Sequence, residues 1–271
     1  MGIEVTSHET NDSKTSSKRL MFAMRTLTRM SAGEIGVHGR ENLKEIPVGA
    51  KVVIATTHIT DNDVPIAAVA LGDKFDLVIT DQSVHRTSAR EFLSYIGESI
   101  AGWENFIPIS WNFGKGGKKH GKLNPKDFDN VRAAMEKGKT PLVAAHNPSF
   151  GVLPPKPGIG AQLLAETTPG EVVILPVSVD VQYEHPEKTA TTYQKLRTLF
   201  RKPKAVVTIG HPIIPKERID SADLISSLEH PANEVRHTVS AMRDRSRIIM
   251  QELAKMLPES KRGTYGTTQK E

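Results

Sequence analysis

His58 and Asp63 are the residues whose types and spacing point most directly to chemistry. They lie in ATTHITDNDVPIA, between an apolar run and a second apolar stretch. A histidine held by a carboxylate can act as a general base, taking a proton from a hydroxyl while the carboxylate orients and stabilises the imidazolium. Five residues turn about 500° around a helix, so the pair meets only if the chain bends between them. Two simpler interpretations stay open: a helix cap formed by Asp61, Asn62 or Asp63, and a histidine in a surface loop.

The elements that must position this pair alternate along the chain from Gly33 onward. Strands are predicted at residues 34–38, 52–56, 76–79, 106–109, 141–145, 172–179 and 205–209. Helices are predicted at residues 64–71, 89–96, 126–136, 159–166 and 233–257. This alternation is typical of an α/β domain with a largely parallel central sheet flanked by helices. Functional sites of such sheets gather at the carboxyl ends of the strands. We therefore expect His58 just after a strand and Asp63 at the start of the next helix.

A basic amphipathic helix is predicted at residues 18–32, ahead of this domain. Its apolar side chains recur at helical spacing with cations beside them: Leu20, Met24, Leu27 and Met30, with Lys18, Arg19, Arg25 and Arg29. The helix either packs on the domain or lies on anionic lipid with Phe22 as an additional anchor. The remaining chain divides into a disordered polar tail at 1–17, the α/β domain at 33–257 and a flexible tail at 258–271.

Composition narrows the classes of function. The 271 residues carry a net charge of +5, contain no cysteine and show no secretory signal, so we expect a cytoplasmic protein without thiol chemistry. The positive charge favours an anionic partner. Aromatic residues make up 5% of the chain, too few for the stacking surfaces of a nucleic-acid-binding protein. No second histidine lies at ligand spacing near His58, which argues against a metal site.

The order of several segments resembles the glycerophospholipid acyltransferase superfamily, typified by bacterial lysophosphatidic acid acyltransferases. His58-x4-Asp63 is similar to the HX4D motif of that superfamily, and VHGRENLKEIPVGAKVVIATTH resembles its lead-in. NFIPIS lies where the family has its second block, and KDFDNVRAAMEKGKTPLVAAHNPSFG resembles the helix and strand before its third. VVILPVSV, with Pro176, is similar to the fourth block, and VTIGHPI to a late strand and turn. The likeness covers about residues 33–215, and it implies an α/β fold and a catalytic pair formed by His58 and Asp63.

The second and third blocks depart from the family pattern. His146 and Asn147 stand at the glutamate and glycine positions of the third block, and Ser149 stands at its arginine position. Ser110 or Trp111 replaces the arginine of the second block. The resemblance associates these positions with the phosphate and glycerol of the acceptor. It therefore makes His146, Asn147 and Ser149 candidate substrate-binding residues and weakens the case for glycerol 3-phosphate or lysophosphatidate as acceptor. A purely structural role for His146 stays open.

Basic residues follow the second and third blocks. GKGGKKHGK, residues 114–122, places Lys115, Lys118 and Lys119 among glycines, whose backbone N–H groups can bind phosphate together with the ammonium groups. A solvated loop is the alternative. Lys156, in LPPKPGIGAQLLAE, takes the place of the lysine that follows the family's third block. We include these four lysines among the candidate substrate-binding residues.

The resemblance implies an O-acyltransferase that moves a fatty acyl group from acyl-CoA or an acyl-carrier protein to a hydroxyl of a (lyso)phospholipid-like acceptor. His58 would deprotonate the hydroxyl, Asp63 would fix the histidine tautomer, and neither a cofactor nor an acyl-enzyme is required. The expected partners are the thioester donor, the lipid acceptor and an anionic membrane surface at the inner face of the membrane. The alternative is a non-catalytic protein that binds lipid or acyl-carrier protein on the same scaffold. The sequence leaves the acceptor, the acyl length and the oligomeric state open.

Overall fold

The computed structural model describes residues 17–60, 62–82, 102, 105–109, 111–112, 122–123, 125–149, 151–182, 202–216, 218 and 232–266. The helices are α1 (Lys18–Ser31), α2 (Asp63–Leu71), α4 (Pro125–Glu136), α5 (Gly160–Thr167) and α8 (Ala232–Lys255). The strands are β1 (Ile35–His38), β2 (Lys51–Thr56), β3 (Leu77–Gln82), β4 (Phe106–Ile109), β5 (Trp111–Asn112), β6 (Lys122–Leu123), β7 (Thr140–Ala144), β8 (Val172–Gln182) and β9 (Lys204–Ile209). Three short 3-10 helices are η1 (Arg40–Glu45), η3 (Glu259–Lys261) and η4 (Gly263–Tyr265).

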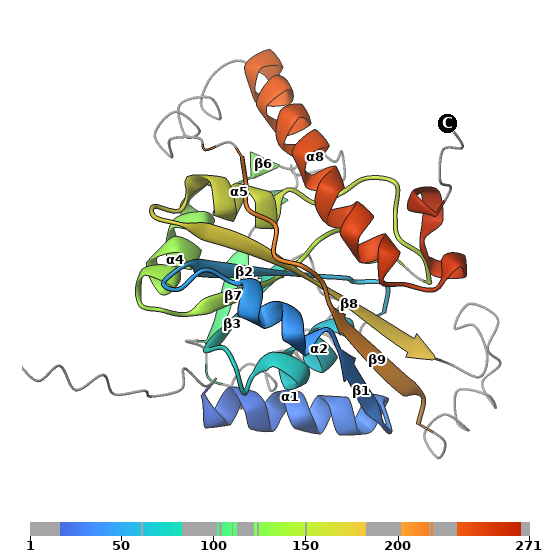
Figure 1. Cartoon of the computed structure of the whole chain (residues 1–271). Helices are drawn as coiled ribbons and strands as arrows, with labels where there is room; N and C mark the ends of the chain where they lie inside the picture. Colours follow the sequence, from blue (N-terminus) through green and yellow to red (C-terminus); the bar gives the residue numbers. More distant parts are fainter. Residues whose placement is uncertain are drawn as a thin grey trace, which may run out of the picture.

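A mixed sheet runs through the middle of the molecule (Figure 1). Its order among the described strands is β1-β9-β8-β2-β7-β3-β4. Neighbouring strands are parallel throughout except for β8 and β9, which pair antiparallel. The predicted α/β fold with a largely parallel sheet is therefore confirmed. The predicted helix at 89–96 lies outside the described residues, and the short antiparallel pair β5–β6 was not predicted.

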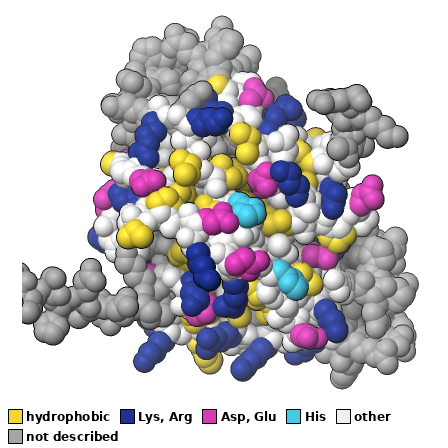
Figure 2. All heavy atoms as spheres, in the orientation of Figure 1, with side chains coloured by type: hydrophobic (Ala, Val, Ile, Leu, Met, Phe, Trp, Pro, Cys, Tyr) yellow, Lys and Arg dark blue, Asp and Glu magenta, His cyan; other side chains and the backbone are white. Residues whose placement is uncertain are grey.

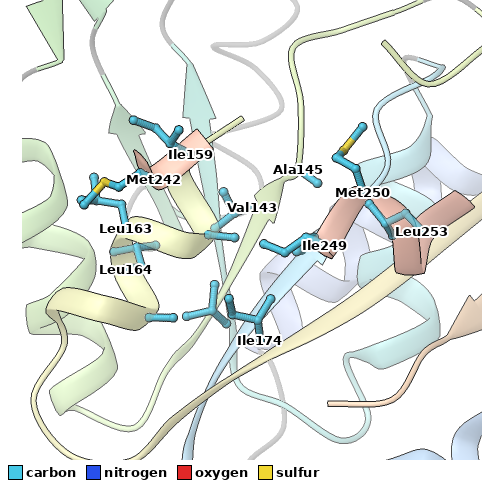
Figure 3. Close-up of a cluster of buried hydrophobic side chains, with 14 of the residues drawn as sticks. Val143, Ala145, Ile159, Leu163, Leu164, Ile174, Met242, Ile249, Met250 and Leu253 are labelled. Atoms are coloured by element: carbon cyan, nitrogen blue, oxygen red, sulfur yellow. The ribbon is translucent and has the colours of Figure 1, made fainter. Parts of the chain in front are cut away.

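Helices cover both faces of the sheet, and β2 serves both layers. Val53 and Ala55 belong to the core under α4, α5 and α8, whereas Val52 and Ile54 belong to the core under α1 and α2. Figure 3 shows the first of these cores, where side chains of α5 and α8 meet over Ile174 of β8. Because β2 is buried on both faces, it is an almost continuous apolar run, as expected for a central parallel strand. The strand that carries His58 is thus held inside the fold.

Helix α1 packs on α2 and buries part of the face that the sequence indicated. Leu20, Met21 and Met24 are buried, but Leu27 is 44% exposed. Gly72, at the end of α2, lies so close to Met21 that a Cβ at residue 72 would stand 2.2 Å from its sulfur. The buried stripe of α1 thus includes Met21 beside Gly72 and excludes Leu27. No helix of the described chain is long and apolar enough to cross a membrane.

The beginning and the end of the chain differ in what the structure describes. Of the predicted tail at 1–17, only Ser17 is described; its hydroxyl accepts a hydrogen bond from the N–H of Leu20 and caps α1. Residues 258–266, which the sequence placed in a flexible tail, instead form η3 and η4. The physical reason lies in Lys261 and Gly263, which contact strand β8 and the loop after β7, as described below.

Candidate functional site

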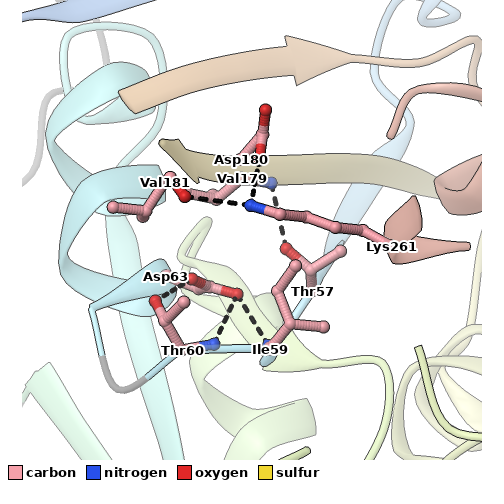
Figure 4. Close-up of polar contacts among 8 residues, drawn as sticks. All are labelled: Thr57, Ile59, Thr60, Asp63, Val179, Asp180, Val181 and Lys261. Atoms are coloured by element: carbon pink, nitrogen blue, oxygen red, sulfur yellow. Dashed lines mark hydrogen bonds and ion pairs between the residues drawn. The ribbon is translucent and has the colours of Figure 1, made fainter. Parts of the chain in front are cut away.

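His58 lies on a tight turn between the carboxyl end of β2 and the first turn of α2. The N–H of Thr57 donates to the carbonyl of Val177 at 3.2 Å, and the Thr57 hydroxyl accepts from the N–H of Val179 at 2.9 Å. These two bonds tie the end of β2 to β8 just before the histidine, and Figure 4 shows the second of them. His58 itself is partly buried. Its placement after a parallel strand is the one predicted from the sequence.

Asp63 is fully buried and holds the backbone of this turn (Figure 4). Its Oδ2 accepts hydrogen bonds from the N–H groups of Ile59 at 2.8 Å and Thr60 at 3.3 Å, and its Oδ1 accepts from the Thr60 hydroxyl. Burial raises the pKa of Asp63 from 3.8 to about 6, while the hydrogen bonds from Thr60, Ile59 and Thr57 act in the opposite direction. The carboxyl group is thus ionised above about pH 6.

The imidazole of His58 is oriented by a backbone carbonyl. Its Nδ1 lies 3.1 Å from the carbonyl oxygen of Thr60. Because a carbonyl can only accept, Nδ1 carries the proton in this contact, and in the neutral ring Nε2 then has the lone pair. Asp63 fixes the same Thr60 through its N–H and hydroxyl. Thr60 therefore links the Asp63 carboxylate to the His58 ring, and the role of Asp63 in fixing the tautomer stays a prediction.

His146 approaches the same turn from the end of β7. Its Nε2 accepts a hydrogen bond from the N–H of His58 at 3.1 Å, and its Nδ1 lies 2.8 Å from the carbonyl oxygen of Asn147. His146 is 2% exposed, and burial lowers its pKa from 6.5 to about 4, with a smaller contribution from the charge of His58. The ring is therefore neutral at physiological pH, with its proton on Nδ1.

The loop after His146 also binds the turn. The N–H of Ser149 donates to the carbonyl of His58 at 3.0 Å, and the N–H of Gly151 donates to that of Ile59 at 3.1 Å. The Ser149 hydroxyl donates to the carbonyl of Val152 at 2.7 Å, and the Asn147 side chain is exposed. The loop after β7 thus brings His146 and Ser149 into contact with His58, whereas the Asn147 side chain faces solvent.

The C-terminal segment closes over this loop. The N–H of Leu153 donates to the carbonyl of Lys261 at 2.9 Å. Gly263 (φ 57°) lies against Leu153, where a Cβ at residue 263 would stand 2.2 Å from the carbonyl oxygen. The Lys261 ammonium binds Asp180 at 2.5 Å and the carbonyl of Val181 at 2.9 Å (Figure 4). One residue, Lys261, therefore connects the loop after β7 with the end of β8.

The other predicted substrate-binding residues are divided between exposed positions and undescribed ones. Lys156 is exposed in the loop before α5. Lys115, Lys118 and Lys119 lie outside the described residues, as do Asp61 and Ser110, and the side chain of Trp111 is not described. In the described ranges no group of three or more His, Asp and Glu side chains is arranged to hold a metal ion.

Thr60 and Lys261 are site-forming residues that the sequence analysis missed. Thr60 carried a signal, because Thr60-x-x-Asp63 has the spacing of a capping box, in which the acidic side chain binds the N–H of the residue three positions before it. Lys261 carried none, since its partner Asp180 is 81 residues away in the chain. Local spacing could have identified the first contact and not the second.

Comparison with models of known protein families finds no match, and comparison with curated protein sequences finds none either. Among solved structures, the chain is similar to the crystal structure of the 1-acyl-sn-glycerophosphate (LPA) acyltransferase PlsC from Thermotoga maritima. The match has a TM-score of 0.41 and 14% sequence identity, and it covers 84% of this chain and 76% of that one. At this similarity the match assigns neither a family nor an activity to the chain.

Proposed function

We propose that the protein is an O-acyltransferase that moves an acyl group from a thioester to a hydroxyl, with His58 as general base. The observation that carries the proposal is the state of the His58 ring. Its Nδ1 is bound to the carbonyl of Thr60, which leaves Nε2 as the proton acceptor. The ring lies at the carboxyl end of a central strand, where sites of α/β sheets gather. The ordered likeness to the acyltransferase superfamily, with HX4D at this place, supports the same assignment.

The reaction that fits this ring is direct transfer. Nε2 of His58 takes the proton of the acceptor hydroxyl as its oxygen attacks the thioester carbonyl carbon. The new C–O bond forms, the C–S bond breaks, and the leaving thiolate receives the proton from the imidazolium. The protein has no cysteine, and the scheme needs no covalent acyl-enzyme. Acyl-CoA or an acyl-carrier protein is the proposed donor, and no cofactor takes part.

Asp63 has two parts in this proposal. It holds Thr60, and through Thr60 the tautomer of His58, by the bonds from the Thr60 N–H and hydroxyl. With its pKa raised to about 6, it is ionised at neutral pH, so its negative charge favours the imidazolium that forms during transfer. The first part depends on geometry and the second on charge, so they can be tested separately.

The proposed acceptor is a (lyso)phospholipid-like molecule with a free hydroxyl. Asn147 and Lys156 are exposed polar side chains on the loop between β7 and α5. An amide and an ammonium group suit the phosphate or glycerol oxygens of such a headgroup. Lys115, Lys118 and Lys119 remain proposed phosphate ligands from the sequence alone. The Ser149 hydroxyl already donates a hydrogen bond to the carbonyl of Val152. Ser149 therefore contributes to the site through its N–H, which donates to the carbonyl of His58.

Helix α1 supports a proposed anionic membrane partner. Phe22 is 64% exposed, and four exposed cations surround it at helical spacing: Lys18, Arg19, Arg25 and Arg29. The helix contains no acidic residue. Figure 2 shows Lys and Arg side chains gathered along the lower edge of the molecule, where Figure 1 places α1. An exposed aromatic residue within a basic helix face suits a surface of anionic lipid.

The membrane partner is tested by co-flotation with vesicles. We expect the protein to float with vesicles that contain anionic phospholipid and to remain behind with zwitterionic ones. Phe22→Ser and the double variant Arg25→Gln, Arg29→Gln should each reduce flotation, and 0.5 M salt should reduce it further because the attraction is screened. Equal flotation by all variants would contradict a role for α1.

The transfer activity is tested with a long-chain acyl-CoA or acyl-carrier protein and a panel of lysophospholipids, with thiol release and acylated product measured together. His58→Ala should lower the transfer rate by about a hundredfold or more, the usual contribution of a general base. His38→Ala, at an exposed histidine on β1, is the matched control and should keep the wild-type rate.

Two outcomes would contradict the proposal. Unchanged transfer by a folded His58→Ala variant would remove His58 as the base. Binding of the donor by the wild-type protein without thioester consumption, with every acceptor tried, would favour the non-catalytic lipid- or carrier-binding alternative. The altered second and third blocks are the feature of the sequence that makes this alternative worth testing.

A further inference from the structure

We propose that His146 is a positioning residue for the general base, fixing the backbone of His58 instead of binding the acceptor. This inference rests on the proposed function, because it assigns His146 a role in the reaction of His58. The geometry behind it is the bond from the N–H of His58 to Nε2 of His146, at 3.1 Å. The sequence had made His146 a candidate ligand of the substrate, and the structure supplies a reason for a different role.

The reason begins where the pairing of β2 with β7 stops. Thr56 is paired with Ala144, and the N–H of Ala145 donates to the carbonyl of Thr56 at 2.8 Å. If the parallel ladder continued, the N–H of His58 would donate to the carbonyl of Ala145. That carbonyl is already bound by the N–H of Gly158, at 2.7 Å. In the structure the His58 N–H donates to the ring of His146 instead.

The close approach of Gly158 keeps this arrangement in place. A Cβ at residue 158 would stand 2.9 Å from the carbonyl oxygen of Ala145 and 3.4 Å from Cα of His146. Only glycine lets the backbone reach the Ala145 carbonyl this closely. The chain segment before α5 thus lies against the Ala145 carbonyl, at the point where the His58 N–H leaves the parallel ladder.

Both peptide groups that flank Cα of His58 are bound by one short segment. Nε2 of His146 accepts from the N–H of His58, and the N–H of Ser149 donates to its carbonyl at 3.0 Å. Fixing the two peptide groups fixes the backbone dihedral angles of His58, and hence the direction in which its side chain leaves the turn. A general base must be placed accurately, since small displacements cost much of its effect.

The chemistry of the ring suits this role. One neutral tautomer satisfies both contacts, with Nδ1 donating to Asn147 and Nε2 accepting from His58. Both nitrogens are thus occupied within the protein. The lowered pKa of His146, about 4, keeps the accepting lone pair present at neutral pH. A glutamate at this position would instead bring a charge into a buried place.

The experiment compares three substitutions at this position in the full-length protein. The amide oxygen of His146→Gln can take the place of Nε2, whereas His146→Asn reaches only the place of Nδ1 and His146→Leu offers no acceptor. We expect His146→Gln to keep kcat within about threefold. His146→Asn and His146→Leu should lose about tenfold to a hundredfold in kcat, because a buried N–H is left without its acceptor. The KM for the acceptor should stay within about twofold in all three variants.

Other results would overturn the inference. A raised acceptor KM with unchanged kcat would show that His146 binds the acceptor. Equal kcat values for the Gln, Asn and Leu variants would show that the His58 N–H contact has no role in positioning. Thermal unfolding of each variant verifies that it is folded at the assay temperature, and the Gln variant provides the conservative rescue.

A second measurement does not depend on activity. NMR of the wild-type protein labelled with ¹⁵N should show a scalar coupling between the His58 amide nitrogen and Nε2 of His146, and ¹⁵N shifts of a ring protonated on Nδ1. Absence of this coupling would overturn the role of His146 alone. Absence of transfer by the wild-type protein, with the coupling present, would overturn the proposed function and leave only a structural contact.

Discussion

Asp63 and His146 hold neighbouring parts of the same turn in different ways. Asp63 is four residues from Ile59 in the chain and binds the N–H groups of Ile59 and Thr60. His146 is 88 residues from His58 and binds its N–H. Three consecutive backbone donors are therefore satisfied by two side chains, one local and one distant. Local sequence can specify the shape of the turn, but the direction of its histidine depends on the packing of β7 beside β2.

The two side chains also differ in charge. Burial raises the pKa of Asp63 to about 6 and lowers that of His146 to about 4. Above about pH 6 an anion thus lies on one part of the turn and a neutral imidazole on the other. Since desolvation is the largest cause of both shifts, each group prefers its uncharged form. At neutral pH His146 is uncharged, whereas Asp63 is ionised although burial disfavours its charge.

The largest expected effect separates the geometry of Asp63 from its charge. Asp63→Ala should lower kcat by a hundredfold or more, because Thr60 is released and the His58 tautomer with it. In Asp63→Asn the amide oxygen can accept from Ile59 and Thr60 while the amide nitrogen donates to the Thr60 hydroxyl. Only the charge is then lost, and we expect kcat to fall by about tenfold. Steady-state kinetics at pH 8 measures both values.

Amide hydrogen exchange shows whether the hydrogen bonds of Asp63 and those of His146 stabilise the turn independently. Asp63→Ala should speed exchange at Ile59 and Thr60 and leave His58 protected, whereas His146→Leu should do the reverse. If either variant exposes all three amides together, the turn is one cooperative unit and the division between local and distant support is wrong.

The next effect concerns stability and pH. The pKa of Asp63 is higher in the folded protein than in the unfolded chain. Its contribution to the unfolding free energy is therefore fully present below pH 3.8 and is lost as pH rises to about 6. For His146, whose folded pKa is lowered from 6.5 to about 4, the contribution is present above pH 6.5 and is lost as pH falls to about 4. Each amounts to about 3 kcal/mol, so the two offset each other in the wild-type protein between about pH 4 and 6.

Urea unfolding from pH 4 to pH 8 tests this offset. Relative to the wild type, Asp63→Asn should gain about 3 kcal/mol as pH rises through the interval, and His146→Gln should lose a similar amount. A charge on His58 also lowers the pKa of His146. The same substitutions are therefore compared in a His58→Gln background, where this effect is absent. Parallel curves for the wild type and Asp63→Asn would show that the pKa of Asp63 is not raised.

The smallest expected effect tests the contact of Gly263 with Leu153, which supports the loop that carries His146. Gly263→Ala places a Cβ 2.2 Å from the Leu153 carbonyl, at a positive φ of 57°. Gly49 also has a positive φ, 84°, but a Cβ there meets nothing within 4 Å. Gly49→Ala should therefore cost about 1 kcal/mol in unfolding free energy from the backbone alone, and Gly263→Ala about 1–3 kcal/mol more because its Cβ overlaps a backbone oxygen. The transfer rate of Gly263→Ala should fall by about twofold, and equal losses in both variants would mean that the Leu153 contact is unimportant.

The sequence predicted those parts of the fold that depend on near neighbours. Alternating apolar runs and helical patterns placed β2 before α2, and with them His58 and Asp63, because that signal lies within a few residues. The predicted inward face of α1 was right at Leu20 and Met24 and wrong at Leu27, which is exposed while Met21 is buried. The bond from the His58 N–H to His146 was not predictable, because it joins residues that lie 88 positions apart in the chain.

The contact between Leu153 and Lys261 means that the turn receives its last support late in synthesis. A growing chain contains His58 and Asp63 early, acquires His146 later and receives Lys261 only about 200 residues after His58. At about 5–20 residues per second, roughly 10 to 40 seconds separate the histidine from the last segment that supports it. The turn that carries His58 would thus stay without this last support until Lys261 has been added to the chain.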